Sequence, residues 1–303
     1  MQLFPKKLSQ IYLVLFVSAF LTITGNFTFF QKTILIYPLS ENWLFLGSLF
    51  FFLFTFLAAL LLLFCYRVTT KPILMVLLMI SAIVSYSTNN YGIVFDHNMI
   101  LNTFETDTSE FLDLVSFKSI LYFFIFGLLP SIFVLKVKLI KISFKAQLWE
   151  RIKTFLVLVI IFVIIVLTFS KHYSSFAREN RDLRLYITPT YYLYSATKFV
   201  DSKFATSTKP FKEIGLDAKL NKKSDTRRLV ILVVGETARA DHMSLNGYDR
   251  NTNPYLEKEE IISFDKMTSC GTDTALSVPC MFSLLDRSSY NHAKGKNMSN
   301  VLD

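Results

Sequence analysis

Internal repeats, low-complexity tracts and a small-residue cleavage site after the first apolar stretch are all missing from this sequence. Charged residues are also scarce, at 18% of the chain, whereas 52% of its 303 residues are hydrophobic and 16% are aromatic. This balance excludes a purely soluble protein with a water-facing surface. The apolar excess lies before about residue 171. The sequence therefore predicts a membrane domain followed by a domain of ordinary soluble composition.

The formal net charge of +9 is high enough to raise the question of nucleic-acid binding. However, the lysines and arginines do not line one helix face with interleaved aromatic residues, as a nucleic-acid surface requires. Much of the positive charge lies in short loops between apolar stretches, which is typical of membrane proteins. We therefore expect a membrane partner and no nucleic acid.

Five uncharged apolar stretches are each long enough for one membrane span, the last two when flanking residues are included. They cover residues 11–30, 43–66, 72–95, 120–135 and 154–170. Basic residues precede the first stretch and fill the loops after the second and the fourth, so we assign these loops to the cytoplasm. With five spans, everything after Ser170 lies outside the cytoplasm.

The chain contains three cysteines in two different settings. Cys65 ends an apolar run and is interpreted as a small buried apolar residue. Cys270 and Cys280 lie ten residues apart in the polar part of the chain. Because the predicted topology places this part in an oxidising compartment, we expect a disulfide between them.

We divide the chain into a five-helix membrane domain (1–171), an interfacial helix and linker (172–228) and the first part of a soluble domain (229–303). The soluble part opens at Leu229 with the continuous run LVILVV, which is typical of a buried parallel strand. A second strand is predicted at residues 261–264, and helices after each strand would give an α/β domain. Ligands of such domains bind beyond the carboxyl ends of the strands.

Two residues stand where chemistry can occur. Glu236 follows the first predicted strand and can ligate a divalent metal, or it can be a polar residue that opens the next helix. Thr274 lies in the turn SCGTDTA, where a metal-stabilised alkoxide would be nucleophilic and exposed amides would hold a phosphate. The alternative for this threonine is a helix cap. Position alone does not separate these roles.

Two long motifs carry a resemblance to a known family. Residues 234–240 (VGETARA) continue through 244–248 (SLNGY) to 251–254 (NTNP), and residues 268–283 read TSCGTDTALSVPCMFS. Both resemble the signature of bacterial phosphoethanolamine transferases that modify lipid A. The resemblance implies an α/β/α domain of the alkaline phosphatase and sulfatase superfamily, which projects into the periplasm from a multi-pass domain in the inner membrane.

The same resemblance assigns roles to individual residues. It makes Glu236 a zinc ligand, Thr274 both a zinc ligand and the nucleophile, and Cys270 and Cys280 a disulfide pair. A zinc site usually takes four ligands, and none of the chain's four histidines matches the family's other ligand positions. We therefore expect the remaining ligands in a longer protein and expect this chain alone to be inactive.

The acidic loop before the fourth predicted span resembles the family in Asn102, Thr106 and Glu110, which such enzymes use to hold substrate. Residues four apart share one helix face, so these three would present an amide, a hydroxyl and a carboxylate as one stripe. The carboxylate suits the ammonium group of ethanolamine. From the residues alone, the alternative is the wet face of an interfacial helix.

The implied activity is transfer of phosphoethanolamine from phosphatidylethanolamine to lipid A or to a core phosphate of lipopolysaccharide. It would run through a phosphoethanolamine-threonine intermediate on a zinc-dependent monomer, and the modified lipid would bind polymyxin less well. Two alternatives stay open. One is a phosphoglycerol transferase of related fold, which does not share the long motifs, and the other is a non-catalytic, truncated membrane module.

Overall fold

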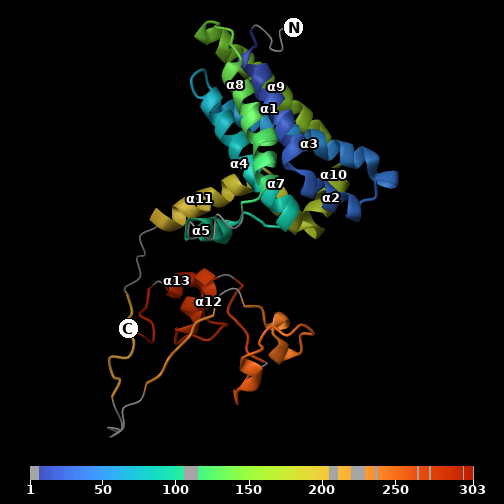
Figure 1. Ribbon diagram of the computed structural model, residues 1–303. Helices are drawn as coiled ribbons and strands as arrows, with labels where there is room; N and C mark the ends of the chain where they lie inside the picture. The colour runs from blue at the N-terminus through green and yellow to red at the C-terminus, as the bar shows by residue number, and fades with distance from the viewer. Residues whose placement is uncertain are drawn as a thin grey trace. The chain divides into compact units, whose positions relative to one another are not determined.

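The computed structural model of the chain describes residues 7–105, 115–204, 211–219, 229–235, 238–264, 266–272, 274–295 and 297–302 (Figure 1). The chain divides into two compact units, Met1–Phe204 and Ala205–Asp303. The first unit includes the helices that follow the last predicted span. The domain borders drawn from the sequence after residues 171 and 228 stay predictions.

Long apolar helices build the first unit (Figure 1). Four of them are long and apolar enough to cross a membrane, and a fifth candidate span is a pair of helices bent by 58°. The four are α3 (Leu39–Phe64), α4 (Thr70–Tyr91), the continuous run of α7 (Phe117–Phe123), η1 (Phe124–Leu128) and α8 (Leu129–Lys136), and α9 (Phe144–Thr168). The bent pair is α1 (Gln10–Gly25) with α2 (Phe27–Ile36). These elements confirm the predicted helical membrane domain.

The first candidate span differs from the single helix predicted over residues 11–30. Asn26 leaves helical geometry, at φ −119° and ψ 25°, between α1 and α2. Its side-chain amide donates to the carbonyls of Leu21 and Thr22, at 3.1 and 3.3 Å, and so satisfies acceptors at the end of α1. The apolar pattern could not reveal this bend because it continues through it.

A π-helical segment, η1, joins α7 to α8 without a break. Pro130, in the first turn of α8, lacks the N–H that would bond back to residue 126, and a wider π turn accommodates this loss. Gly127 within η1 lies close to α4, because a Cβ atom there would stand 3.1 Å from the Cβ atom of Ala82. The small residue lets the two helices approach each other.

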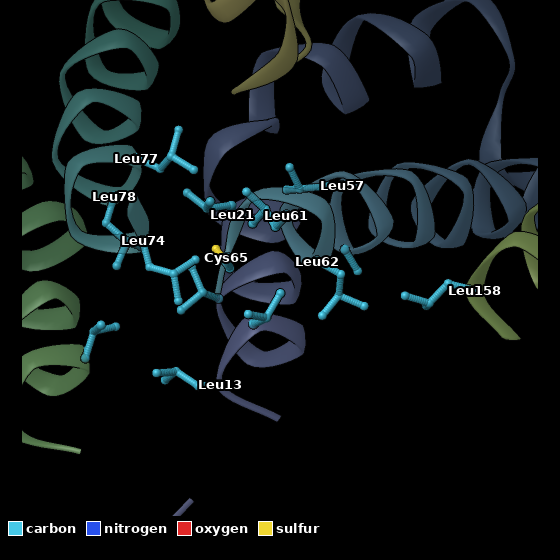
Figure 2. Packing of buried hydrophobic residues seen from close by; sticks show 14 of the residues in the cluster. Leu13, Leu21, Leu57, Leu61, Leu62, Cys65, Leu74, Leu77, Leu78 and Leu158 are labelled. Carbon is cyan, nitrogen blue, oxygen red and sulfur yellow. The ribbon is translucent and has the colours of Figure 1, made fainter. Parts of the chain in front are cut away.

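The main core of the first unit lies between α1, α3 and α4. Figure 2 shows leucine side chains from these helices around Cys65, which is fully buried, together with Leu158 from α9. The labelled members are Leu13, Leu21, Leu57, Leu61, Leu62, Leu74, Leu77, Leu78 and Leu158. Close packing of this kind holds helices together in a bilayer, where lipid tails are as apolar as leucine.

Hydrogen bonds between buried polar side chains add to this packing at one end of the bundle. Gln10 is 6% exposed and donates to the carbonyl of Cys65 at 2.8 Å and to Thr70 Oγ1 at 2.5 Å. Gln147 in α9 donates in turn to Oε1 of Gln10. One glutamine therefore connects α1 to the α3–α4 turn and to α9.

The first unit also contains shorter helices. α5 (His97–Glu105) lies between α4 and α7 in the chain, and α10 (Ser170–Glu179), the 3-10 helix η2 (Arg181–Tyr186) and α11 (Thr190–Phe204) follow α9. α5 lies beside α11 (Figure 1), and the rings of Phe104 and Phe199 stack between them with centroids 5.2 Å apart. α10 packs on a second apolar core that includes Phe29 and Phe45. α5 and α10 therefore belong to the folded membrane unit.

The described residues of the second unit contain short helices and no strand ladder. The helices are η3 (Ala240–His242), η4 (Ser244–Asn246), η5 (Leu256–Lys258), α12 (Thr274–Met281) and α13 (His292–Gly295). An isolated parallel bridge joins Lys212 to Met298.

The strands predicted at residues 229–234 and 261–264 are not formed. The side chains from Leu229 to Val234 are 41–87% exposed, and no described segment pairs with them. A β-branched run forms an interior parallel strand only where neighbouring strands satisfy its backbone groups. The sequence pattern identified a segment suited to a sheet without showing which segments would pair with it.

Candidate active site

Thr274 begins the helix α12, and its side chain is exposed. The helix is eight residues long and contains Pro279, which cannot donate a backbone hydrogen bond. A hydroxyl in the first turn of a helix lies among backbone N–H groups that have no intrahelical acceptor. This location suits a group that must meet an anion such as a phosphate.

The turn before Thr274 is fixed to the far end of α12. Cys270 and Cys280 form a disulfide, with Cα atoms 6.3 Å apart, and Cys280 is buried. The Ser269 hydroxyl donates to the carbonyl of Gly271 at 2.7 Å. A Cβ atom at Gly271 would stand less than 3.0 Å from the end of the Leu276 side chain, so the turn and the helix approach closely there. The disulfide and this contact together restrict where Thr274 can lie.

The motif residues after Glu236 form a compact polar loop. Thr252 Oγ1 donates to the carbonyl of His242 at 2.8 Å and accepts from the backbone N–H of Ser244 at 2.9 Å. Asn246 Nδ2 donates to the carbonyl of Ala240 at 2.9 Å. Gly247, at φ 93°, takes a left-handed conformation that ends η4. Except for His242, these residues belong to the motif segments, whose sequence pattern does not predict this structural role.

An exposed charge cluster lies at the start of the same loop. Arg239 donates two hydrogen bonds to the Asp241 carboxylate, at 3.0 and 2.7 Å, and His242 Nδ1 lies 3.0 Å from that carboxylate. The Arg239 hydrogen bond, followed by that of His242, holds the pKa of Asp241 well below its usual range. Asp241 therefore stays ionised at lower pH than an ordinary aspartate and keeps Arg239 hydrogen-bonded to it.

Of four further predicted site residues, the structure describes Asn102 alone. Asn102 lies on α5, which begins where the Asp96 carboxylate accepts a hydrogen bond from the N–H of Met99 at 2.8 Å. Thr106, Glu110 and Glu236 lie outside the described residues. The predicted stripe of Asn102, Thr106 and Glu110 therefore stays a prediction.

The donor set for zinc is likewise incomplete. Within the described residues, no three side chains of the His, Cys, Asp and Glu types lie together as metal ligands. A carboxylate from Glu236 and a hydroxyl from Thr274 are oxygen ligands that zinc accepts, but they are two of the usual four. The described part of the chain therefore does not make a zinc site by itself.

Two family models match this chain. One, described as phosphoethanolamine transferase EptA/EptB, matches residues 53–204. The other, described as sulfatase, matches residues 228–303. The first covers spans and following helices, and the second covers both motifs after residue 228.

Known proteins resemble the chain along nearly its whole length. It is 39% identical to phosphatidylethanolamine transferase Mcr-1 of Escherichia coli, across 99% of this chain and 57% of that protein. It is 30% identical to phosphoethanolamine transferase EptA of Salmonella typhimurium, across 98% and 55%. The structure of lipooligosaccharide phosphoethanolamine transferase A (EptA) from Neisseria meningitidis matches with a TM-score of 0.88 at 30% identity, across 99% and 56%. The chain thus spans little more than half the length of these relatives.

Proposed function

Because the chain belongs to the phosphoethanolamine transferase EptA/EptB family, we propose that the whole protein transfers phosphoethanolamine from phosphatidylethanolamine to lipid A or to a core phosphate. The observation that carries this proposal is the exposed Thr274 at the start of α12, held by the disulfide from Cys270 to Cys280. The names of the relatives support the group transferred. They do not favour the phosphoglycerol alternative.

The proposed chemistry has two displacements at phosphorus. In the first, Thr274 Oγ attacks the phosphorus of phosphatidylethanolamine, the bond from phosphorus to the glycerol oxygen breaks, and diacylglycerol leaves with the proton. In the second, a phosphate oxygen of the acceptor attacks the same phosphorus and releases the threonine hydroxyl. The membrane domain restricts both lipids to one surface, which raises their effective concentration at the threonine.

We propose zinc as the cofactor of the whole protein, with Glu236 and Thr274 as two of its ligands. Zinc would polarise the phosphoryl oxygens and stabilise an alkoxide. The other ligands would come from residues outside the two motifs. The chain's own contribution is to position Thr274 through the turn that the Cys270–Cys280 disulfide holds, and to form the polar loop that follows Glu236.

We also propose that Asn102, Thr106 and Glu110 hold the donor's headgroup. The carboxylate of Glu110 would pair with the ethanolamine ammonium, while the amide and the hydroxyl would bond phosphate oxygens. This proposal predicts that Glu110→Gln raises KM for phosphatidylethanolamine more than it lowers kcat, because the lost pairing is present before and during transfer. An unchanged KM would contradict it.

The direct experiment is intact mass spectrometry of the full-length protein after incubation with phosphatidylethanolamine and zinc. We expect an adduct of phosphoethanolamine mass on the unaltered protein and none on Thr274→Ala. The matched control is Thr272→Ala, since Thr272 is an exposed threonine in the same turn. It should retain the adduct.

The outcomes separate the alternatives named from the sequence. An adduct of glycerol phosphate mass would indicate the phosphoglycerol transferase. No adduct on any form would favour the non-catalytic module. An adduct on Thr274→Ala would move the nucleophile elsewhere.

Orientation and cellular effect are parts of the same proposal. The basic loops predict that the chain after Ser170 lies in the periplasm of a bacterial inner-membrane protein, which a reporter fused after Phe204 would test.

Added ethanolamine ammonium groups would reduce the negative charge that attracts cationic peptides. Cells with the full-length protein should therefore survive polymyxin better than cells with Thr274→Ala, and equal survival would count against a lipid A acceptor.

A further inference from the structure

A cavity of about 390 Å³ opens between α3, α10 and η2 in the first unit. Its volume lies within the range of roughly 300–1,000 Å³ that is usual for small-molecule sites. The residues that line the cavity include neither Glu236 nor Thr274, and none of Asn102, Thr106 and Glu110, which are proposed to hold the donor's headgroup. It is therefore a separate feature of the membrane domain.

Apolar and aromatic side chains form one wall of this cavity. Phe29 and Phe52 line it from the candidate spans, and Tyr173 and Phe176 line it from α10. The Tyr173 hydroxyl lies 3.0 Å from that of Ser48, which fixes its ring against α3. Phe176 meets Phe29 edge to face, with ring centroids 6.3 Å apart. The wall is thus a packed surface and continues onto a membrane-spanning helix.

Two arginines also line the cavity. Arg181 and Arg184 lie on η2, and both side chains are exposed. Among the described residues neither forms an ion pair, and no acidic side chain lines the cavity. The neighbouring Arg178, by contrast, pairs with Glu179 and lies outside the lining. The cavity therefore combines apolar side chains with two cations that form no ion pair within the described part of the chain.

The place of the cavity along the chain sets its depth in the bilayer. α9 ends at Thr168, and α10 and η2 follow directly. Aromatic side chains and arginines gather at this level, where hydrocarbon meets headgroups. The aromatic wall reaches into the span α3, whereas the arginines come from η2 beyond the end of α9. An occupant would need an acyl chain at one end and an anion at the other.

We propose that this cavity binds a membrane glycerophospholipid, with its phosphate between Arg181 and Arg184 and an acyl chain against the aromatic wall. Guanidinium groups bind phosphate oxygens through charge-assisted and often paired hydrogen bonds. The inference does not depend on the proposed transfer reaction, because it needs neither Thr274 nor zinc. A lipid held here would be bound without being consumed.

Native mass spectrometry of the full chain in detergent tests this proposal. The probe is phosphatidylglycerol, a phosphodiester lipid without ethanolamine, and the comparison is diacylglycerol with the same acyl chains. We expect at least tenfold better retention of phosphatidylglycerol, and about tenfold loss of that retention in the double variant Arg181→Gln, Arg184→Gln. Arg178→Gln is the matched control and should retain the lipid fully.

A second measurement places the acyl chain. In a variant with Phe176→Trp whose native Trp43 and Trp149 are replaced by phenylalanine, phosphatidylglycerol with brominated acyl chains should quench the single tryptophan more strongly than in the same variant with both arginines replaced. Equal retention of phosphatidylglycerol and diacylglycerol would overturn the proposal. So would unchanged retention in a double variant that keeps its helical circular dichroism, or quenching that does not depend on the arginines. None of these readouts measures phosphoethanolamine transfer, so failure here leaves that proposal unaffected.

Discussion

Asn26 and Thr188 are joined by two hydrogen bonds between residues that lie 162 positions apart in the chain. Asn26 Nδ2 donates to the carbonyl of Thr188, and the backbone N–H of Thr188 donates to Asn26 Oδ1, both at 2.9 Å. The two residues are 2% and 5% exposed. The bend in the first candidate span is therefore fixed to the segment that leads into α11.

Replacing Asn26 by alanine should destabilise the membrane unit. The change leaves the buried N–H and carbonyl of Thr188 without their partner, and each buried unsatisfied group costs roughly 1–3 kcal/mol. We expect the free energy of unfolding in a mixed-detergent titration to fall by about 2–3 kcal/mol. Asn42→Ala is the control, since Asn42 also marks a kink but its side-chain amide donates to the nearby carbonyl of Pro38. Equal losses in both variants would mean that the link to Thr188 contributes nothing.

This link illustrates what the sequence could and could not predict. The spans followed from apolar length because a helix satisfies its own backbone groups within a bilayer. The bend at Asn26 depends on a partner far along the chain, so no local pattern contains it. The exposed run from Leu229 to Val234 shows a second limit of local patterns. Its residues suit a strand, but a strand forms only with neighbouring strands that these residues do not specify.

Gln10 and Gln147 should show strong coupling in a double-mutant cycle. Gln147 donates to Oε1 of Gln10, and Gln10 donates onward to Thr70 and Cys65. Gln147→Leu leaves a buried acceptor unpaired, so we expect a loss of about 1–2 kcal/mol. Because the two changes remove one shared interaction, the double variant with Gln10→Leu should lose less than the sum of the single losses. Additive losses in the same detergent titration would show that the two side chains act independently.

Asp241 should titrate at an unusually low pH because of Arg239. Its pKa lies below the ordinary value of 3.8. The stabilisation that the charged carboxylate contributes to the folded state is therefore fully present above pH 3.8. It is lost as the pH falls through the lower, folded-state pKa. We expect Arg239→Gln to raise the pKa of Asp241 toward 3.8, measured by NMR of carboxyl-labelled aspartate. The exposed pair should leave overall unfolding almost unchanged.

The control for this measurement is Arg250→Gln, which removes an exposed arginine outside the cluster. It should leave the titration of Asp241 unchanged. An identical titration in the unaltered chain and in Arg239→Gln would show that the carboxylate does not depend on this guanidinium.

The candidate site shows a different balance between prediction and structure. The motif predicts Thr274 as a site residue, and the helix start at this residue gives its hydroxyl a local setting that suits phosphate. The polar loop around Thr252 was not foreseen, because its hydrogen bonds join residues eight and ten positions apart through an irregular backbone. Sequence motifs identify which residues matter, whereas irregular loops decide what each one contacts.

The disulfide from Cys270 to Cys280 should restrain α12 and the turn that carries Thr274. Denatured chain without reductant should take up alkylating label at one cysteine, Cys65, and reduced chain at all three. A disulfide that closes a short loop stabilises the folded state by about 2–3 kcal/mol. Hydrogen exchange of peptides covering Thr274–Met281 should therefore be at least tenfold faster in the double variant Cys270→Ser, Cys280→Ser than in Cys65→Ser. Equal exchange in the two variants would mean that the turn is held by its other contacts, such as that between Gly271 and Leu276.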